Sequence, residues 1–220
     1  MRTSIVIEEY LQAIYELVQG EGKTKAVHLT SRLGNSPSTV HSTLARMLRD
    51  GLIEIDEKKC ISFTEKGNRQ AEGLARRHRL VETFLCDHLG IPWHEVHQHT
   101  HILEHGLTPL VEEKLYQYLG NPKFCPHGNP FPGESGSLPP NMIRLNQVKE
   151  GEEFEVVMVD ESLEDDKELM KYLWDYDIRP QKKHLLVRTN PITQSLLISG
   201  EKGEAHLPLT IAPQIGVILL

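Results

Sequence analysis

The segment from residue 26 to residue 63 constrains the fold most tightly, because it predicts two short helices in quick succession and then a β-hairpin. Apolar residues recur at helical spacing over residues 26–33, and a glycine follows directly. Ser36 precedes Pro37, and the residue before a proline favours the extended backbone that an N-cap requires. Proline at the first helical position loses no hydrogen bond. We therefore expect a second helix over residues 37–50.

This second helix separates into two faces. Its apolar stripe consists of Val40, Leu44, Met47 and Leu48. The polar residues at its start and along its other face are Ser36, Ser38, Thr39, His41, Ser42, Arg46 and Arg49. Small hydroxyl side chains can approach base edges and phosphates, and the arginines further along can reach the DNA backbone. The polar set is therefore the predicted DNA-binding surface, and the helix is predicted to be a recognition helix.

Two short alternating strands follow within LIEIDEKKCISFT, with charged residues at the tip between them. A hairpin directly after a recognition helix is a wing, so residues 1–64 are predicted to form a winged helix-turn-helix domain. The charge distribution agrees weakly: residues 1–80 hold 13 Lys and Arg against 10 Asp and Glu, although the whole chain carries a net charge of −7. The alternative is a three-helix bundle whose hairpin has no part in binding.

The stretch VHQHTHILEHGL, residues 96–107, predicts a metal site. Its ligand-type residues are His97, His101, Glu104 and His105, which recur at steps of four, three and one. On an α-helix all four project from one side, where they offer only imidazole nitrogens and carboxylate oxygens. Such donors suit a divalent transition metal. Seven of the twelve histidines lie between His78 and His105, a density that favours a metal site over a solvated polar face.

Further candidate ligands lie elsewhere in the chain. Glu9 belongs to the first expected helix, residues 4–19, and a ligand from a different domain would let a metal change the shape of the protein. His78 and Glu82 form an i,i+4 pair in a long expected helix, and His97 completes a second candidate set with them. A single pair of this kind is more often a solvated contact than a ligand pair, so only the joint occurrence of these residues supports a metal site.

The remainder of the chain predicts further domains. Helical patterns over residues 65–120 expose more apolar surface than three helices can hide, which favours a helical domain that forms a homodimer. Residues 121–141 hold six prolines and are predicted to be a linker. One helix, near residues 165–174, and five short strands are expected in residues 142–220, as is typical of an SH3-like small β-barrel. The expected strands are residues 154–159, 184–188, 195–199, 205–207 and 217–219. The expected fold class is thus mainly α with α+β parts.

Composition argues against several classes of protein. No run of about 18 apolar residues is present, and the N-terminus lacks a secretion signal, so we expect a cytoplasmic protein that does not cross a membrane. The three cysteines, Cys60, Cys86 and Cys125, share no CxxC spacing. Neither a disulfide framework nor a zinc finger is therefore indicated.

Two other functions fit parts of the sequence. His101, Glu104 and His105 match the HxxEH pattern of inverted zinc peptidases, in which the glutamate is the general base. A peptidase needs a substrate cleft and an open coordination position, and it leaves the winged helix unexplained. A metal storage or chaperone protein is the second alternative, and it has no use for a recognition helix. We therefore expect a regulator rather than an enzyme.

Several segments together resemble the diphtheria toxin repressor and manganese transport regulator family of metal-dependent transcriptional repressors. They are EEYLQAIYEL, STVHSTLARMLRDGLI, RRHRLVETFL, the VH and LEH of the histidine stretch, and GNPFPG. The resemblance covers nearly the whole chain. It implies a winged-helix domain, a helical dimerisation domain with two metal sites, and an SH3-like (FeoA-like) C-terminal domain. It also implies binding to palindromic double-stranded operator DNA, as a metal-loaded dimer that controls genes of metal uptake or homeostasis.

The resemblance also implies ligand sets, position by position. The primary, activating site is matched by Glu9, His101, Glu104 and His105. The ancillary site is matched by His78, Glu82 and His97, and the C-terminal domain is expected to supply Glu161 and Glu164. Some manganese-type members instead recruit a cysteine and a histidine from the linker. Cys125 and His127 are such a pair, ranked lower because these residues also suit a simple turn.

The expected metal follows from the donors. The iron-sensing branch of the family carries a methionine where Glu9 stands and a cysteine where His101 stands, whereas manganese sensors carry carboxylates at both positions. Without a sulfur ligand the site is harder, which disfavours Cu(I). The expected cofactor is therefore Mn²⁺ or Fe²⁺, with Zn²⁺ and Co²⁺ as alternatives.

Overall fold

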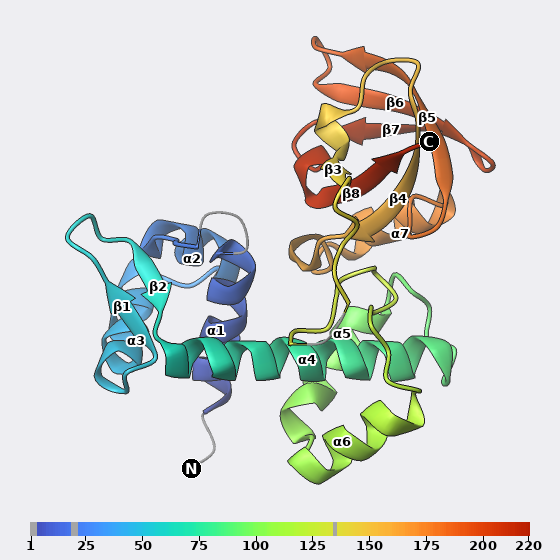
Figure 1. Ribbon diagram of the computed structural model, residues 1–220. Helices are drawn as coiled ribbons and strands as arrows, with labels where there is room; N and C mark the ends of the chain where they lie inside the picture. The colour runs from blue at the N-terminus through green and yellow to red at the C-terminus, as the bar shows by residue number, and fades with distance from the viewer. Residues whose placement is uncertain (1–3, 19–21, 134–135) are drawn as a thin grey trace. The chain divides into compact units, whose positions relative to one another are not determined.

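The computed structural model describes residues 4–18, 22–133 and 136–220. The chain divides into two compact units, Met1–Arg77 and His78–Leu220. The N-terminal unit contains helices α1 (Ile5–Val18), α2 (Ala26–Leu33) and α3 (Pro37–Arg49), strands β1 (Ile53–Ile55) and β2 (Ile61–Phe63), and the beginning of helix α4 (Glu65–Asp87) (Figure 1). This is the order that the sequence predicts.

The start of α3 has the predicted cap. Ser36 has an extended backbone, with φ −63° and ψ 150°, and its Oγ accepts a hydrogen bond from the Thr39 amide at 3.2 Å. Pro37 is the first helical residue. The helix ends at Arg49, one residue earlier than expected, because Gly51 follows in the left-handed conformation with φ +68°.

The core of the N-terminal unit confirms most of the predicted apolar stripe of α3. Val40, Leu44 and Met47 are buried, but Leu48 is 47% exposed, so the stripe is narrower than expected. Residue 48 lies at the edge of the face that packs inward. The buried residues packed with the stripe include Tyr10, Leu11, Ile14, Leu29, Ile53, Ile61, Ala71 and Leu74.

The hairpin after α3 confirms the predicted wing. Strands β1 and β2 are antiparallel, with Ile53 opposite Phe63. At the tip, Asp56 Oδ1 accepts hydrogen bonds from the amides of Lys58 at 3.0 Å and Cys60 at 2.9 Å. The charged tip is therefore a hydrogen-bonded turn.

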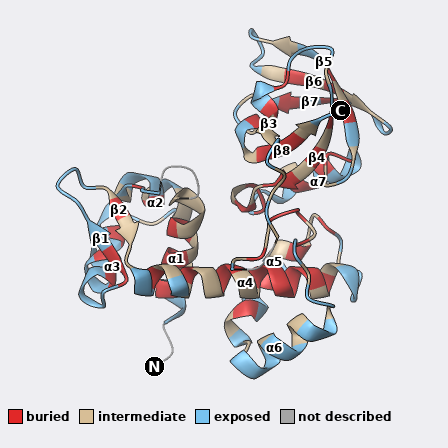
Figure 2. Cartoon of the chain, viewed as in Figure 1, coloured by how far each residue is buried: buried red, intermediate tan, exposed pale blue. Residues whose placement is uncertain are grey.

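The C-terminal unit begins within α4 and continues with α5 (Val96–Leu103), a 3₁₀ turn (Glu104–Gly106) and α6 (Pro109–Tyr118). The helix that carries the histidines was expected from about Trp93, but it begins at Val96. Residues 92–95 instead form a turn, in which the Glu95 amide donates to the Pro92 carbonyl at 2.8 Å. No residue of α6 is buried, and Figure 2 shows its exposed surface.

The proline-rich segment after α6 is packed in place over its described residues. Cys125, His127 and Phe131 are buried, and the Cys125 amide donates to the Asn129 carbonyl at 2.9 Å. Gly128 has φ +86°, and a Cβ atom there would lie 2.1 Å from the Val157 carbonyl oxygen. The middle of the segment expected to be a linker, residues 125–131, is thus packed into the interior of this unit.

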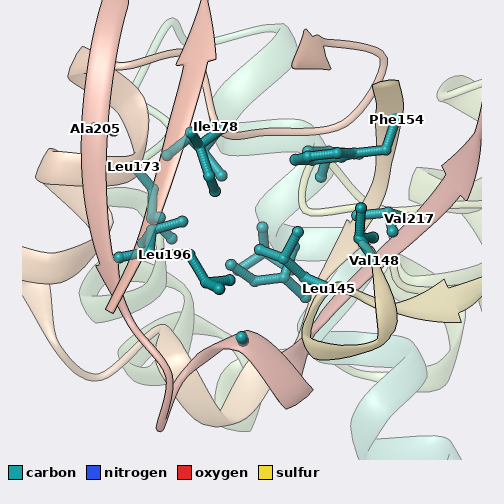
Figure 3. Close-up of a cluster of buried hydrophobic side chains, with 14 of the residues drawn as sticks. Leu145, Val148, Phe154, Leu173, Ile178, Leu196, Ala205 and Val217 are labelled. Carbon is teal, nitrogen blue, oxygen red and sulfur yellow. The ribbon is translucent and has the colours of Figure 1, made fainter. Parts of the chain in front are cut away.

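The rest of the unit is a six-stranded antiparallel sheet, in the order β3-β8-β4-β5-β6-β7. Its strands are β3 (Ile143–Arg144), β4 (Glu153–Val159), β5 (Lys183–Asn190), β6 (Ser195–Gly200), β7 (Gly203–Pro208) and β8 (Ile215–Leu219), with helix α7 (Lys167–Asp175) inserted after β4. The five expected strands and the helix are confirmed, and the two-residue β3 is additional. The sheet encloses a core that includes Leu145, Phe154, Leu173, Ile178 and Val217 (Figure 3). No helix in the described ranges is long and apolar enough to cross a membrane.

Candidate metal centre

Four ligand-type side chains from three segments of the C-terminal unit converge. They are His78 and Glu82 on α4, His97 on α5, and Glu164, and each offers one donor atom within 4.8 Å of the others. His97 Nδ1 lies 3.0 Å from Glu164 Oε2, and His78 Nε2 lies 3.1 Å from Glu82 Oε1. The structure therefore brings together four of the five residues that the resemblance assigns to the ancillary site.

Local structure places these donors. His78 and Glu82 are one helical turn apart, so their side chains share a face of α4. Glu164 follows a 3₁₀ turn that begins after Asp160, whose Oδ1 accepts a hydrogen bond from the Ser162 amide at 3.1 Å. This capped turn points Glu164 towards the two helices, where its side chain is fully buried.

Glu161, the fifth expected ligand, lies outside this cluster. Its Oε1 accepts a hydrogen bond from Arg79 Nε at 2.5 Å, and both side chains are largely buried. Arg79 also donates to the carbonyl of Pro130. The two glutamates are three residues apart but face different partners: Glu164 faces imidazoles and Glu161 faces a guanidinium.

A second cluster contains His101, Glu104 and His105. The fully buried Glu104 directs Oε1 towards His101 Nδ1 at 3.4 Å and His105 Nε2 at 3.5 Å. Its Oε2 lies 2.6 Å from Nδ1 of His78, so Glu104 joins the two clusters. The His101 side chain is 45% exposed and borders on solvent. Glu9 lies on α1 in the N-terminal unit, is partly buried, and stays a predicted ligand.

The lower-ranked pair, Cys125 and His127, forms a third cluster with Glu82. His127 Nδ1 lies 3.4 Å from Glu82 Oε2 and 3.1 Å from Glu164 Oε1. Its Nε2 lies 3.2 Å from the Trp93 carbonyl oxygen, which orients the ring. The proline-rich segment therefore does more than turn the chain, because it places two donors beside the predicted ancillary ligands.

The buried imidazoles and carboxylates stabilise each other's charges. Burial lowers the pKa of His78, but the negative charges of Glu82 and Glu104 outweigh it and hold that pKa well above the usual value. Burial raises the pKa of Glu82, but His127 and His78 together hold it well below its usual range. The fold therefore favours the charged forms of both the imidazoles and the carboxylates.

His97 has an additional partner that sequence reasoning missed. Its Nε2 lies 3.1 Å from Asp165 Oδ1, while its Nδ1 faces Glu164. Burial opposes the charged ring, but hydrogen bonds to Asp165 and Glu164 raise the pKa of His97 to about 11. No spacing in the sequence distinguishes Asp165 from other surface acids, since its role depends on contact with a helix about 70 residues earlier.

The donors fit a divalent transition metal. Imidazole nitrogens and carboxylate oxygens are ligands for Mn²⁺, Fe²⁺ and Zn²⁺. Glu164 Oε1 is buried and lies 3.1 Å from His127 Nδ1, but the residues that the structure describes give it no hydrogen bond. A buried acceptor without a hydrogen bond is costly, and a bound cation would satisfy it.

The predicted DNA-binding residues lie on the exposed surface of the N-terminal unit. All seven of them are exposed. Several are also engaged locally. The Ser36 hydroxyl caps α3 and lies 2.9 Å from Ser38 Oγ and 2.8 Å from Thr39 Oγ1, and the Ser42 hydroxyl donates to the Thr39 carbonyl at 2.9 Å. Arg46 projects from the exposed side of α3, whereas Arg49 Nε pairs with Asp50 at 3.3 Å.

The fold and the clusters together define a class of DNA-binding protein. In this class, one chain combines a winged-helix unit, buried sets of metal ligands and an SH3-like sheet. Comparison with known families agrees. Residues 2–61 match "Iron dependent repressor, N-terminal DNA binding domain", residues 64–133 match "Iron dependent repressor, metal binding and dimerisation domain", and residues 143–219 match "FeoA domain". The chain belongs to the iron-dependent repressor family, which includes the diphtheria toxin repressor.

The chain is similar to known repressors over most of its length. The iron-dependent repressor IdeR of Mycobacterium leprae is 33% identical over 96% of this chain and 95% of its own length. The diphtheria toxin repressor of Corynebacterium efficiens is 33% identical over 78% of each chain. A manganese-dependent transcriptional repressor in complex with manganese superposes with a TM-score of 0.80, at 27% identity over 97% of this chain and 100% of that one. ScaR with bound Zn²⁺ superposes with a TM-score of 0.82, at 28% identity over 97% and 99%.

The expected function class is therefore confirmed. The chain is a metal-dependent transcriptional repressor with a divalent metal as its cofactor, and its relatives are repressors rather than enzymes. The HxxEH pattern does not mark a peptidase here, because its glutamate and histidines lie within the segment that matches the metal-binding domain of repressors.

Proposed function

We propose that this repressor binds palindromic double-stranded operator DNA as a homodimer when it holds a divalent transition metal, and that it controls genes of metal uptake or homeostasis in the cytoplasm. The observation that supports this most is the convergence of buried imidazole and carboxylate donors in a chain whose α3 presents an exposed polar face. A metal-responsive regulator needs both a set of metal ligands and a DNA-binding surface.

The proposed DNA contacts are those of the recognition helix. The hydroxyl groups at the start of α3 suit base edges and phosphates, and Arg46 suits a phosphate. Ser36 contributes mainly through its cap, which fixes where the helix begins. The wing places Lys58 and Lys59 at its tip, where they can add backbone contacts.

The proposed homodimer uses the exposed apolar side chains of α5 and α6. These are Ile102 (75% exposed), Leu103 (48%), Leu110 (69%), Val111 (51%) and Tyr118 (66%). Apolar groups gathered on two consecutive helices are typical of an interaction surface. A twofold dimer presents two recognition helices to a palindrome.

The proposed activating ligands are Glu9, His101, Glu104 and His105, and the proposed ancillary ligands are His78, Glu82, His97 and Glu164. Glu161 is left out because its carboxylate pairs with Arg79. When bound, the metal supplies positive charge that holds carboxylates and imidazoles together. To change the ratio of DNA-binding to non-binding conformations from 1:99 to 99:1, the metal must bind the DNA-binding conformation more tightly by roughly 5.5 kcal/mol. Two sites per protomer can share this difference.

The proposed metal is Mn²⁺ or Fe²⁺. The set with Glu9 lacks sulfur and is therefore hard enough for either ion, and Co²⁺ and Zn²⁺ are the alternatives. The relatives named above include iron-dependent and manganese-dependent repressors, so both metals occur in the family.

The test is DNA binding by the full chain after chelation and after titration with Mn²⁺, Fe²⁺ or Zn²⁺ separately. The probe is a duplex selected by the metal-loaded protein from a random pool. We expect binding with metal and its loss after chelation. Equal binding in the chelated protein would refute the proposed function, and the order of the metals would identify the cofactor.

A further inference from the structure

A cavity of about 290 Å³ lies between the first turns of α5 and the segment from Glu164 to Lys167. We propose that this cavity is the entrance through which metal ions reach the buried ligands, and that Asp165 and His97 Nε2 form a capture site at its mouth. This inference rests on the proposed metal dependence. It adds a route and a first binding step to the predicted ligand sets.

The burial of the proposed ligands calls for an entrance. Glu82, Glu104 and Glu164 are completely shielded from solvent at their side chains, and the His78 side chain is 6% exposed. A divalent ion does not cross a protein interior unless ligands replace its water, because an isolated charge is very costly to bury. The buried centre therefore needs an opening whose walls can hold the ion on its way in.

The walls of the cavity extend from solvent to the centre. They include the fully buried Glu164 and the neighbouring Asp165, whose side chain is 51% exposed. His97, 18% exposed, and His101, 45% exposed, also line the cavity, and they are the most exposed of the proposed ligands in the C-terminal unit. Ligand atoms are thus available at every depth between the surface and Glu164.

His97 lies between an inner and an outer carboxylate. Its Nδ1 lies 3.0 Å from Glu164 Oε2, and its Nε2 lies 3.1 Å from Asp165 Oδ1. An imidazole can bind a metal through either nitrogen. An ion can therefore be bound first on the outside, by Asp165 and Nε2, and then on the inside, by Glu164 and Nδ1 of the same ring.

The charge at the mouth suits a divalent cation. The carboxylates of Glu95 and Asp165 line the cavity with exposed fractions of 37% and 51%, so they attract an approaching cation. Lys167 also lines the cavity and opposes this attraction. Nδ1 of His94, in the same wall, is buried and has no hydrogen bond among the described residues, so it is a further nitrogen donor. The lining therefore contains more ligand-type groups than the proposed sites use.

The two neighbouring aspartates have different roles. Asp166 caps α7, because its Oδ1 accepts a hydrogen bond from the Leu169 amide at 3.0 Å, and it does not line the cavity. Asp165 directs its carboxylate to His97 instead. The start of α7 therefore does not depend on Asp165, and Asp166 serves as a matched control for it.

The experiment follows Co²⁺ binding to the full chain by stopped flow, with tryptophan fluorescence as the signal. The Trp93 ring lies against the His127 ring, with centroids 4.6 Å apart, so a paramagnetic ion in the buried centre should quench its emission. We expect Asp165→Asn to lower the association rate constant about tenfold, because it removes the charge at the mouth. Asparagine keeps an acceptor for His97. Asp166→Asn removes the same charge one residue away, keeps the cap, and should associate at the wild-type rate.

The two rate constants distinguish an entrance from a role in orienting His97. Loss of orientation raises the dissociation rate, measured with excess EDTA, whereas loss of an entrance lowers the association rate. The difference between Asp165→Asn and wild type should shrink at high salt, since Asp165 is exposed. Lys167→Gln should speed association. An unchanged association rate in Asp165→Asn, or equal slowing in Asp166→Asn, would overturn the inference.

This outcome is independent of the DNA-binding assay. If Asp165→Asn associates as fast as wild type, metal-dependent DNA binding would still support the proposed function. Slow association in Asp165→Asn, together with a wild type that binds DNA equally after chelation, would support the entrance and refute the proposed function.

Discussion

Arg79 and Glu161 make a buried ion pair that allows a quantitative test of how the C-terminal unit is held together. The Nε–Oε1 distance is 2.5 Å, and the two side chains are 7% and 11% exposed. Removing one partner of such a pair leaves the other buried and uncompensated, which costs about 3–5 kcal/mol. We therefore expect Arg79→Met to lower the free energy of unfolding by about this amount, with a smaller loss for Glu161→Gln, which keeps a neutral acceptor.

The assay is urea unfolding of the chelated protein, followed by circular dichroism, for both single variants and the double variant. If the side chains act as a pair, the double variant should be more stable than the sum of the single losses predicts, by about 0.5–3 kcal/mol. Glu161→Gln should also keep the full metal count. Additive losses, or one fewer bound ion in Glu161→Gln, would refute the assignment of Glu161 to Arg79.

Three further predictions concern the DNA surface, the dimer and pH. Arg46→Ala should weaken binding to all duplexes alike and reduce the salt slope by about one, measured by fluorescence anisotropy. Unchanged affinity would exclude a phosphate contact. Leu110→Glu, at a side chain that is 69% exposed, should leave the fold intact and convert the proposed dimer to a monomer in sedimentation; a persistent dimer would place the interface elsewhere. Burial lowers the pKa of His184, only partly offset by its hydrogen bond to the Asp177 carbonyl and the nearby charges of Asp177 and Glu201, so the neutral ring is favoured in the fold. The stabilising effect of the neutral His184 ring is complete above the unfolded pKa of about 6.5 and is lost as pH falls towards the lower folded value. The measurement is the free energy of unfolding of the wild type and of His184→Gln at several pH values. A difference between the two proteins that does not change with pH would contradict this prediction.

The elements of the fold were predictable where local chemistry determines them. The Ser36-Pro37 pair fixes the start of α3 through a cap and a preset φ angle. The strands of the C-terminal sheet are recognisable because apolar and polar residues alternate along them. The start of α5 was less predictable. Residues 93–95 contain neither proline nor glycine, but a turn closed by the Pro92 carbonyl delays the helix to Val96.

The candidate ligand sets were predictable only in part. Helical spacing identified His78 with Glu82, because those two residues share a face of one helix. The spacing could not separate Glu164 from Glu161, since which of them faces His97 depends on the 3₁₀ turn between them and on the position of Arg79.

The proline-rich segment marks the same limit. Its composition predicts a loop, but its burial depends on contacts such as the Asn129 side-chain amide, which donates to the Val159 carbonyl at 2.8 Å. That contact joins residues 30 positions apart. Because such contacts cannot be read from the sequence, the sequence alone does not rank Cys125 and His127 with the other metal ligands.

The most direct test of the account measures metal affinity twice, in the absence and in the presence of saturating operator DNA. If the ion favours the DNA-binding state, thermodynamic linkage requires DNA to raise the metal affinity by the same factor by which the metal raises the DNA affinity. We expect the two factors to agree and to exceed tenfold, the equivalent of about 1.4 kcal/mol of coupling. A metal affinity that is the same with and without DNA would contradict the account.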